Sequence, residues 1–277
     1  MRMKKTLFLG FYVIMAAAAA LTSSVSTAAK AVELDGLIEP YLIVNIGSSV
    51  PGVLDAVEVD RGDLVKKGQR LARLQDKVER ATMELSRARA QMKSTIAARQ
   101  ARLDYTQRKQ QRMEELYKKK VIPFEEMDES QTDNKLAEMQ LAEEVENLGL
   151  AELEYKRSVE VVNRMTIRSP ITGVVIERFL SPGEYVEDQP ILKLAQIDPL
   201  NVEVFAPVEM FGTVKVGMQA KVRPEKPIGG SYNAKVVIVD RVIDAASGTF
   251  GIRLEIPNSK YHLPAGLKCR VIFPPAR

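Results

Sequence analysis

The feature that most constrains this 277-residue chain is an internal repeat. The segment from Ser48 to Leu74 and the segment from Ser169 to Ala195 read alike at a constant offset of 121 residues. The matched pairs include Ser48 and Ser169, Gly52 and Gly173, Gly62 and Gly183, Val65 and Val186, and Leu71 and Leu192. Each copy is a run of short apolar strands broken by glycines, which permit the backbone angles of tight turns. Neither copy has enough apolar surface to close a core alone. The repeat therefore predicts two half-domains folded onto each other, with the chain between them projecting outward.

The chain between the two copies is predicted to be helical. Residues 76–118 contain neither glycine nor proline and consist mainly of good helix formers, so they predict one long helix. Apolar residues are loosely spaced along it, at Val78, Leu85, Met92, Ile96, Leu103, Met113 and Leu116. Residues 125–164 predict a second helix, with Gly149 as the one glycine inside it.

Heptad spacing in the second run predicts that it packs against the first. Apolar residues recur every seven positions in two rows, one of Leu141, Leu148, Tyr155 and Val162 and the other of Val145 and Val159. Each helix has roughly 40 residues, so at about 1.5 Å per residue it is about 60 Å long. The connection through Pro123 is short, and the helices must therefore run antiparallel. We expect residues 76–165 to form an antiparallel coiled-coil hairpin.

The N-terminus has the pattern of an export signal. Basic residues at positions 2, 4 and 5 precede an apolar stretch from Leu7 to Leu21, and a segment of small residues with A-x-A-type cleavage sites follows. The apolar stretch has about 15 residues, fewer than the roughly 20 that a spanning helix needs. No cysteine follows it, which excludes a bacterial lipoprotein anchor. We expect residues 1–31 to be a cleaved signal peptide and the protein to be periplasmic; the alternative is an uncleaved N-terminal anchor.

Composition argues against several classes of function. The chain has 40 basic and 36 acidic residues, and loss of Arg2, Lys4 and Lys5 with the signal leaves 37 against 36, or 36 against 36 if Lys30 is also removed, so nucleic-acid binding has no electrostatic support. His262 is the single histidine and Cys269 the single cysteine, and neither has partners at metal-ligand spacing. Nothing marks an activated nucleophile. We therefore expect no catalytic residues, no metal and no cofactor, and we expect Cys269 to be a buried thiol in a strand.

The last 80 residues predict a small β-barrel. Apolar alternation places strands at residues 201–206, 217–223, 235–244, 248–256 and 267–273, with a short helix at residues 207–213. Glycine, proline and asparagine separate the later strands, and short strands at this spacing suit a closed or nearly closed barrel.

With these parts in place, the chain resembles the periplasmic adaptor subunits, or membrane fusion proteins, of tripartite efflux pumps and type I secretion systems. The resemblance lies in residues 52–71 (GVLDAVEVDRGDLVKKGQRL), in residues 169–176 (SPITGVVI), and in the barrel at residues 242–250, 253–258 and 263–266. It implies an α+β fold: a split biotinyl/lipoyl-like β-domain interrupted by a long antiparallel α-helical hairpin and followed by a small β-barrel. The domains are then residues 1–31 (signal), 32–75 (first lipoyl-like half with an N-terminal strand), 76–165 (hairpin), 166–196 (second half) and 197–277 (barrel). The lipoyl-like turn glycines are Gly52, Gly62, Gly173 and Gly183.

The resemblance also implies partners. Such adaptors bridge an inner-membrane transporter and an outer-membrane channel protein, self-associate as a hexamer or trimer of dimers, lie peripheral to the inner membrane, and are not enzymes. A cleaved signal favours the resistance-nodulation-division type of pump over an ATP-driven exporter or type I system, which remains the alternative. In this family the hairpin tip contacts the channel through Arg, three residues, Leu, six residues and Ser. Here the channel-contacting positions fall on Arg112, Leu116, Ile122, Pro123 and Asp128, and Pro123 replaces the serine.

Two other classes of function are weighed against this interpretation. A lipoyl or biotinyl carrier bears its modified lysine at the turn joining the two halves, and here about 90 residues replace that turn. The one Met-Lys pair in the insert, Met92-Lys93, is expected in the middle of the first helix, where an attaching enzyme would not recognise it. A purely structural envelope coiled coil would account for the hairpin but not for the split β-domain or the barrel.

Overall fold

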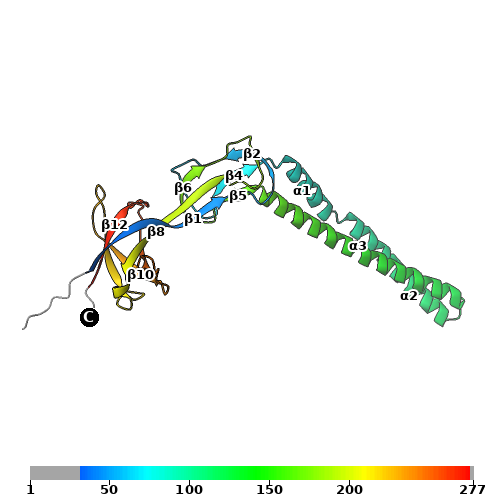
Figure 1. Ribbon diagram of the computed structural model, residues 1–277. Coiled ribbons are helices and arrows are strands. Elements are labelled where there is room, and N and C mark those ends of the chain that lie inside the picture. Colours follow the sequence, from blue (N-terminus) through cyan, green and yellow to red (C-terminus); the bar gives the residue numbers. More distant parts are fainter. Residues whose placement is uncertain (1–31, 275–277) are drawn as a thin grey trace, which may run out of the picture. The chain divides into compact units, whose positions relative to one another are not determined.

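The computed structural model describes residues 32–274, so the signal-peptide prediction lies outside the described residues. The described chain divides into two compact units. One comprises residues 32–38, 201–256 and 266–274 and holds the barrel; the other comprises residues 39–200 and 257–265 and holds the split β-domain and the helices. Two long strands, β1 (Val32–Ile46) and β8 (Leu192–Pro207), contribute residues to both units (Figure 1). Between residues 32 and 274, none of the helices is both long enough and apolar enough to span a bilayer.

The split β-domain consists of two interlocked copies of the repeat. The first copy contributes β2 (Gly52–Val57), β3 (Leu64–Val65) and β4 (Arg70–Leu74), and the second contributes β5 (Thr166–Arg168), β6 (Gly173–Arg178) and β7 (Tyr185–Val186). Strand β3 of the first copy pairs with β6 of the second, and β7 of the second pairs with β2 of the first. Strand β4 lies between β2 and β5. Each copy thus supplies edges that only the other copy can pair, which is why neither half can fold alone.

The two copies also repeat their local hydrogen bonds. The hydroxyl of Ser48 donates to the carbonyl of Val50 at 2.5 Å, and that of Ser169 donates to the carbonyl of Ile171 at 2.6 Å. Between the copies lies one apolar core, whose fully buried members include Leu54, Val65, Leu71, Leu74, Val175, Val186, Leu192 and Leu194. Burying a side chain of this size stabilises the fold by about 1.5–3 kcal/mol. The matched positions of the sequence repeat therefore meet in a shared core.

The insert between β4 and β5 is a helical hairpin, but its first arm is broken. Helix α1 (Lys77–Ala90) ends at residue 90 and α2 (Ser94–Lys118) begins at residue 94, whereas α3 (Phe124–Arg164) is continuous (Figure 1). The prediction of one helix over residues 76–118 was therefore wrong at residues 91–93. The break follows from the positions of the side chains that face α3. The last of them in α1 is Ala90, and a seven-residue repeat would place the equivalent side chain in α2 at residue 97. It lies instead at Ile96, one residue earlier. The interruption absorbs that one-residue shift, and pairing with α3 overrides the helical propensity of the segment.

Half of the predicted seam is correct. Most of the less exposed residues of α3 follow a three-four spacing, and Asp133 and Val159 lie beside it: Met127, Ser130, Asn134, Ala137, Leu141, Glu144, Leu148, Ala151, Tyr155, Ser158 and Val162. The predicted row of Leu141, Leu148, Tyr155 and Val162 belongs to this seam. Of the other predicted row, Val159 is half-buried next to Ser158, whereas Val145 is 52% exposed and lies outside the seam. The second row consists instead of small and polar residues. Apolar character alone could not identify it, because small side chains also allow two helices to approach closely.

The barrel closes around strands from both ends of the chain. Besides β1 and β8 it uses β9 (Gln219–Pro224), β10 (Tyr232–Val239), β11 (Thr249–Ile256) and β12 (Lys268–Phe273). The strand order is β1-β12-β9-β10-β11-β8, and β8 also pairs with β1, so the ring is closed. Residues 32–38, which the sequence analysis grouped with the first lipoyl-like half, thus complete the barrel, with Val32 opposite Phe273. Where a short helix was predicted at residues 207–213, the chain forms one 3-10 turn, Val208–Met210.

The barrel interior is apolar and includes the single cysteine. Strand β12 alternates exposed and buried residues, and Cys269, Val271 and Phe273 point inward. Burial raises the pKa of the Cys269 thiol to about 12, because the thiolate would be desolvated there. The thiol is therefore structural, as the sequence indicated. The predicted α+β fold, with its split lipoyl-like domain, hairpin and barrel, is confirmed.

Candidate functional site at the hairpin tip

The turn that joins α2 to α3 is a tight helix-ending motif. The amide of Val121 donates to the carbonyl of Leu116 at 2.9 Å, and the amide of Lys120 donates to the carbonyl of Tyr117 at 2.8 Å. Lys120 has a φ of 56°, in the left-handed region. These two bonds and this backbone conformation define a Schellman motif, whose left-handed position is usually glycine. Pro123 then precedes the first residue of α3 with extended backbone angles, so it starts the second helix without needing an amide donor.

Large apolar side chains are exposed around this turn. Tyr117, Val121 and Phe124 expose 40%, 65% and 58% of their surface. The rings of Tyr117 and Phe124 pack edge to face with centroids 6.0 Å apart. Lys118, Lys119 and Lys120 are exposed beside them. Exposed apolar side chains with a polar rim are a combination found at protein-binding surfaces. The sequence analysis missed this cluster, although three large apolar residues within eight positions of a predicted turn were a usable signal.

The tip residues predicted from the resemblance occupy different environments. Arg112 and Asp128 are exposed on α2 and α3, and neither takes part in an ion pair among residues 32–274. Leu116 and Ile122 are half-buried, and Pro123 is exposed at the start of α3. The tip thus leaves the Arg112 guanidinium available to a partner. Leu116 is part of the turn itself, because its carbonyl accepts a hydrogen bond from the Val121 amide.

Polar contacts hold the two arms together next to the tip. Lys109 and Asp133 form an ion pair at 2.9 Å, and the hydrogen bond that Lys109 donates to Asp133 raises the pKa of Lys109. The hydroxyl of Thr106 lies 3.1 Å from the side-chain oxygen of Asn134, and both Thr106 and Ser130 are buried in the seam. Partly exposed ion pairs contribute only about 1 kcal/mol or less. This part of the hairpin therefore combines one weak ion pair with buried apolar groups such as Leu103 and Ala137.

The turn glycines lie in the split β-domain, at equivalent places in the two copies. Gly62 and Gly183 have φ angles of 94° and 92°, which side chains rarely adopt. The amide of Gly62 donates to the carbonyl of Val175 at 2.9 Å, and that of Gly183 donates to the carbonyl of Leu54 at 2.8 Å, so each turn binds the other copy. Gly52 and Gly173 begin β2 and β6, and a Cβ at Gly173 would lie 2.0 Å from the carbonyl oxygen of Ala195. These glycines position the two halves: Gly62 and Gly183 through their backbone conformation, Gly173 through its close approach to Ala195.

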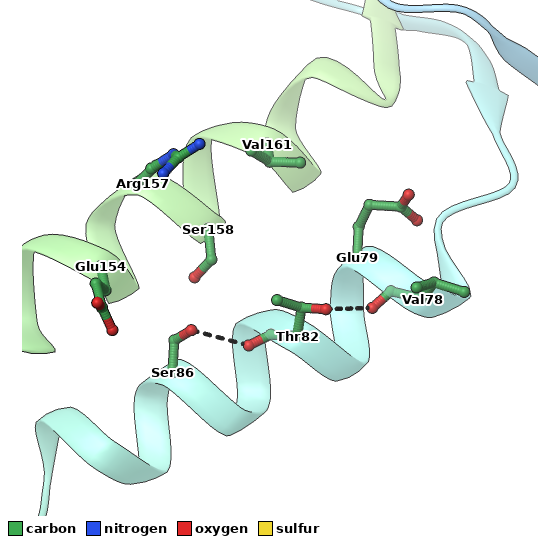
Figure 2. Close-up of a pocket in the computed structure, with 8 residues that line it drawn as sticks. All are labelled: Val78, Glu79, Thr82, Ser86, Glu154, Arg157, Ser158 and Val161. Atoms are coloured by element: carbon green, nitrogen blue, oxygen red, sulfur yellow. Dashed lines mark hydrogen bonds between the residues drawn. The ribbon is translucent and has the colours of Figure 1, made fainter.

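A groove of about 350 Å³ lies between α1 and α3. It is lined by Val78, Glu79, Thr82, Ser86, Glu154, Arg157, Ser158 and Val161 (Figure 2). The hydroxyls of Thr82, Ser86 and Ser158 each donate to a carbonyl of their own helix at 2.7–3.0 Å. Ser86 and Ser158 are seam residues, so the groove exists because small side chains occupy the seam. Its hydroxyls are committed to the backbone, whereas Glu79, Glu154 and Arg157 also line it and form no ion pair within residues 32–274.

The two bound groups to consider are a metal ion and the lipoyl or biotinyl group of a carrier lysine, neither of which the sequence led us to expect. Over residues 32–274, no cluster of three or more His, Cys, Asp or Glu residues is placed to hold a metal ion. The expected mid-helix position of Met92-Lys93 was wrong, because both residues lie in the break between α1 and α2. That break joins two helices, whereas a carrier lysine occupies a turn between strands. The carrier hypothesis therefore gains no support from the corrected position.

Comparison with known proteins identifies the family. The model of the CzcB-like, barrel-sandwich hybrid domain matches residues 42–196, which is more than half of the chain. This chain belongs to the CzcB-like barrel-sandwich hybrid family. The cobalt-zinc-cadmium resistance protein CzcB of Cupriavidus metallidurans is 28% identical over 172 residues, covering 62% of this chain and 31% of CzcB. A UPF0194 membrane protein of Yersinia pseudotuberculosis is 23% identical over 286 residues, covering 83% of this chain and 86% of that protein.

Solved structures share the CzcB-like architecture. MacA from Actinobacillus actinomycetemcomitans superposes with a TM-score of 0.74 at 24% identity, covering 88% of this chain and 78% of MacA. The membrane fusion protein Spr0693 from Streptococcus pneumoniae R6 superposes with a TM-score of 0.61 at 16% identity, covering 87% of this chain and 97% of that one. At these identities the likeness establishes the fold. The resemblance to membrane fusion proteins that the sequence motifs indicated is thereby confirmed.

Proposed function

We propose that this protein is a periplasmic adaptor of an efflux system, bridging an inner-membrane transporter and an outer-membrane channel. The observation that carries the proposal is a hairpin whose continuous helix of 41 residues, about 60 Å long, ends in exposed apolar and basic side chains. The β-domain that holds this hairpin matches the CzcB-like model over residues 42–196. A relative from Alcaligenes sp. is named cation efflux system protein CzcB. In this proposal the protein acts by assembly, and no chemical step is required of it.

The hairpin tip is the proposed channel contact. Arg112 offers several donors from an exposed position, and the cluster of Tyr117, Val121 and Phe124 can exclude water from its hydrogen bonds. Leu116, Ile122, Pro123 and Asp128 complete the tip that the family motif indicates. The transporter is proposed to be of the resistance-nodulation-division type, supported by the signal-peptide pattern of residues 1–31. An adaptor for an ATP-driven exporter is the alternative. Self-association as a hexamer or a trimer of dimers belongs to the same proposal.

Crosslinking in intact cells tests the proposal. The protein is crosslinked and purified, and its partners are identified by mass spectrometry. We expect one inner-membrane transporter, whose class decides between the two types of pump, and one outer-membrane channel. Arg112→Asp should remove the channel from the crosslinked set and abolish export, while the transporter remains. Lys156→Asp, a charge reversal at an exposed position within α3, is the control and should remove neither. Recovery of the channel with Arg112→Asp, Leu116→Asp would show that the tip does not engage it.

A further inference from the structure

Three neighbouring strands of the barrel carry only basic charges on their outer face. Strand β9 lies between β12 and β10 in the sheet. Together the three strands hold five exposed basic residues and no acidic residue: Lys221, Arg223, Lys235, Lys268 and Arg270. The nearest acidic positions of the sheet lie on the flanking strands, with Glu33 and Asp35 on β1 and Glu255 on β11. This part of the barrel therefore presents a basic surface, which we call the basic face.

The charges of the basic face are poorly compensated within the barrel. Arg223 of β9 lies directly opposite Arg270 of β12 in the strand register. Like charges directly opposite each other destabilise a sheet. Arg270 forms one ion pair, with Glu33 at 3.5 Å, whereas Lys221 and Arg223 form none with residues 32–274. A bound anion would relieve this repulsion, so the basic face favours a negatively charged ligand.

A mainly apolar pocket lies next to the basic face, where β9 begins and β12 ends. Its volume is about 290 Å³, close to the lower limit of about 300 Å³ for small-ligand pockets. The apolar part of its lining consists of Ala220, Ile272, Phe273 and Pro274. The polar part consists of Gln219, Lys221 and Asn233. Lys221 belongs both to the pocket and to the basic face, so the two features form one continuous site.

The polar side chains of the pocket can hold an anionic head group. The strand register places Lys221 between Ile272 of β12 and Asn233 of β10. In the described chain, the side chains of Gln219, Lys221 and Asn233 make no hydrogen bond or ion pair. An ammonium and two amides can donate to a phosphate or carboxylate, while the methylenes of Lys221 lie along an apolar wall. Arg223 follows Lys221 by two residues on the same face and adds a cation about 7 Å away along the strand.

We propose that this pocket binds an anionic amphiphile, a molecule with a short alkyl or acyl chain and a phosphate or carboxylate head group. The chain occupies the pocket against Ile272 and Phe273, and the head group accepts hydrogen bonds from Lys221 and Asn233. The basic face attracts the anion to the site. A neutral amphiphile lacks the head-group contacts, and a simple anion lacks the apolar ones. The site uses no residue of the hairpin tip, so it is independent of the proposed channel contact.

Calorimetric titration of the purified protein with alkyl phosphates tests the site. We expect octyl phosphate to bind saturably, with one molecule per chain. Burying one methylene strengthens binding about fourfold, so octyl phosphate should bind about 15-fold more tightly than hexyl phosphate. Inorganic phosphate supplies the head group alone and octyl glucoside a neutral head with the same chain, and each should bind at least about tenfold more weakly than octyl phosphate. No binding of octyl phosphate, or equal affinities for the hexyl and octyl compounds, would overturn the proposal.

Two lysine variants locate the binding site. Lys221→Glu should lower the affinity for octyl phosphate by at least about tenfold, because it removes a charged hydrogen-bond donor and introduces a repulsive charge. Lys268→Glu makes the same change of charge on the same face, but it lies four residues before Ile272, or about 13 Å along β12. Its effect is screened at that distance and should stay below about threefold. Both lysines are exposed, so both variants should fold. Equal losses of affinity would show that the general charge of the face binds the anion, and would overturn the pocket.

Vesicle flotation distinguishes the two sources of such an amphiphile, the membrane and the surrounding solution. The protein is floated with vesicles of phosphatidylcholine, with or without phosphatidylglycerol. If the ligand is a membrane lipid, the vesicles with phosphatidylglycerol carry the protein, and octyl phosphate or Lys221→Glu releases it. If the ligand is a free amphiphile, octyl phosphate binds and neither type of vesicle does. Arg112 is unchanged in these variants, so a failure of this proposal is distinguished from a failure of the channel contact.

Discussion

Replacing Lys120 by glycine should stabilise the hairpin. Lys120 holds a φ of 56° at the left-handed position of the tip turn, between the two hydrogen bonds that close it. A residue with a Cβ loses about 1–2 kcal/mol in this conformation relative to the right-handed one. Glycine does not have that penalty, but it makes the unfolded chain more flexible, which lowers stability by about 0.5–1 kcal/mol. The two terms leave a net gain of about 0.5–1 kcal/mol for Lys120→Gly.

The neighbouring residue provides a matched control. Lys119 has a φ of −85°, which every residue adopts readily, so Lys119→Gly should lower stability by about 0.5–1 kcal/mol through chain flexibility alone. Both variants remove one exposed lysine charge and add one glycine. The difference between them therefore isolates the left-handed strain, at about 1–2 kcal/mol. Far-ultraviolet circular dichroism during urea unfolding measures it, because α1, α2 and α3 supply the helical signal of the described chain. If Lys120→Gly destabilised the hairpin as much as Lys119→Gly, the strain assigned to this turn would not exist.

Three further outcomes follow from packing and burial. Leu148→Ala should lower hairpin stability by about 1–3 kcal/mol, which is below the range for a fully buried leucine because Leu148 is only half-buried. The control Glu143→Ala, at an exposed position, should change stability by less than about 0.5 kcal/mol. Equal effects of the two substitutions on thermal unfolding would refute the seam. Gly173→Ala should prevent or severely weaken folding of the split β-domain, because its Cβ would overlap the Ala195 carbonyl. Gly149→Ala has open space around it and should stabilise α3 by up to about 1 kcal/mol. Calorimetry would distinguish the two effects. Cys269 should react with a thiol reagent at pH 8 only after unfolding, since burial raises its pKa to about 12; rapid reaction of the folded protein would contradict this.

The hairpin shows how far heptad patterns reach. The row of Leu141, Leu148, Tyr155 and Val162 could be predicted, because large apolar residues at seven-residue spacing leave few alternatives for their burial. The other row could not, because it consists of Ala137, Glu144, Ala151 and Ser158, residue types that also occupy solvent-facing positions. Val78, Leu85 and Met92, the apolar residues expected along the first arm, each expose more than half of their surface. Apolar spacing thus predicts that a helix has a partner, but the side chains that meet that partner can be small or polar.

The tip shows a similar division. The short connection and Pro123 were enough to predict a turn between antiparallel helices. The exposed cluster of Tyr117, Val121 and Phe124 was not predicted, because exposure depends on how the turn closes, and that depends on Lys120 adopting a left-handed backbone that its side chain disfavours. The break at residues 91–93 has the same origin: residues 76–118 favour helix locally, and only the register with α3 interrupts it.

By itself, the sequence determined the architecture. The repeat, whose two copies are 121 residues apart, requires two half-domains to share one core. A long run of helix formers between the copies can only leave that core as a hairpin. Tertiary structure decided which strands of one copy pair with the other, that Val32 to Leu37 close the barrel against β12, and which faces of the hairpin remain exposed. Periodicity and propensity are properties of neighbouring residues. Strand pairing and barrel closure depend on segments more than 100 residues apart, and exposure on the hairpin depends on how its two arms pair; no local pattern specifies which of those segments meet.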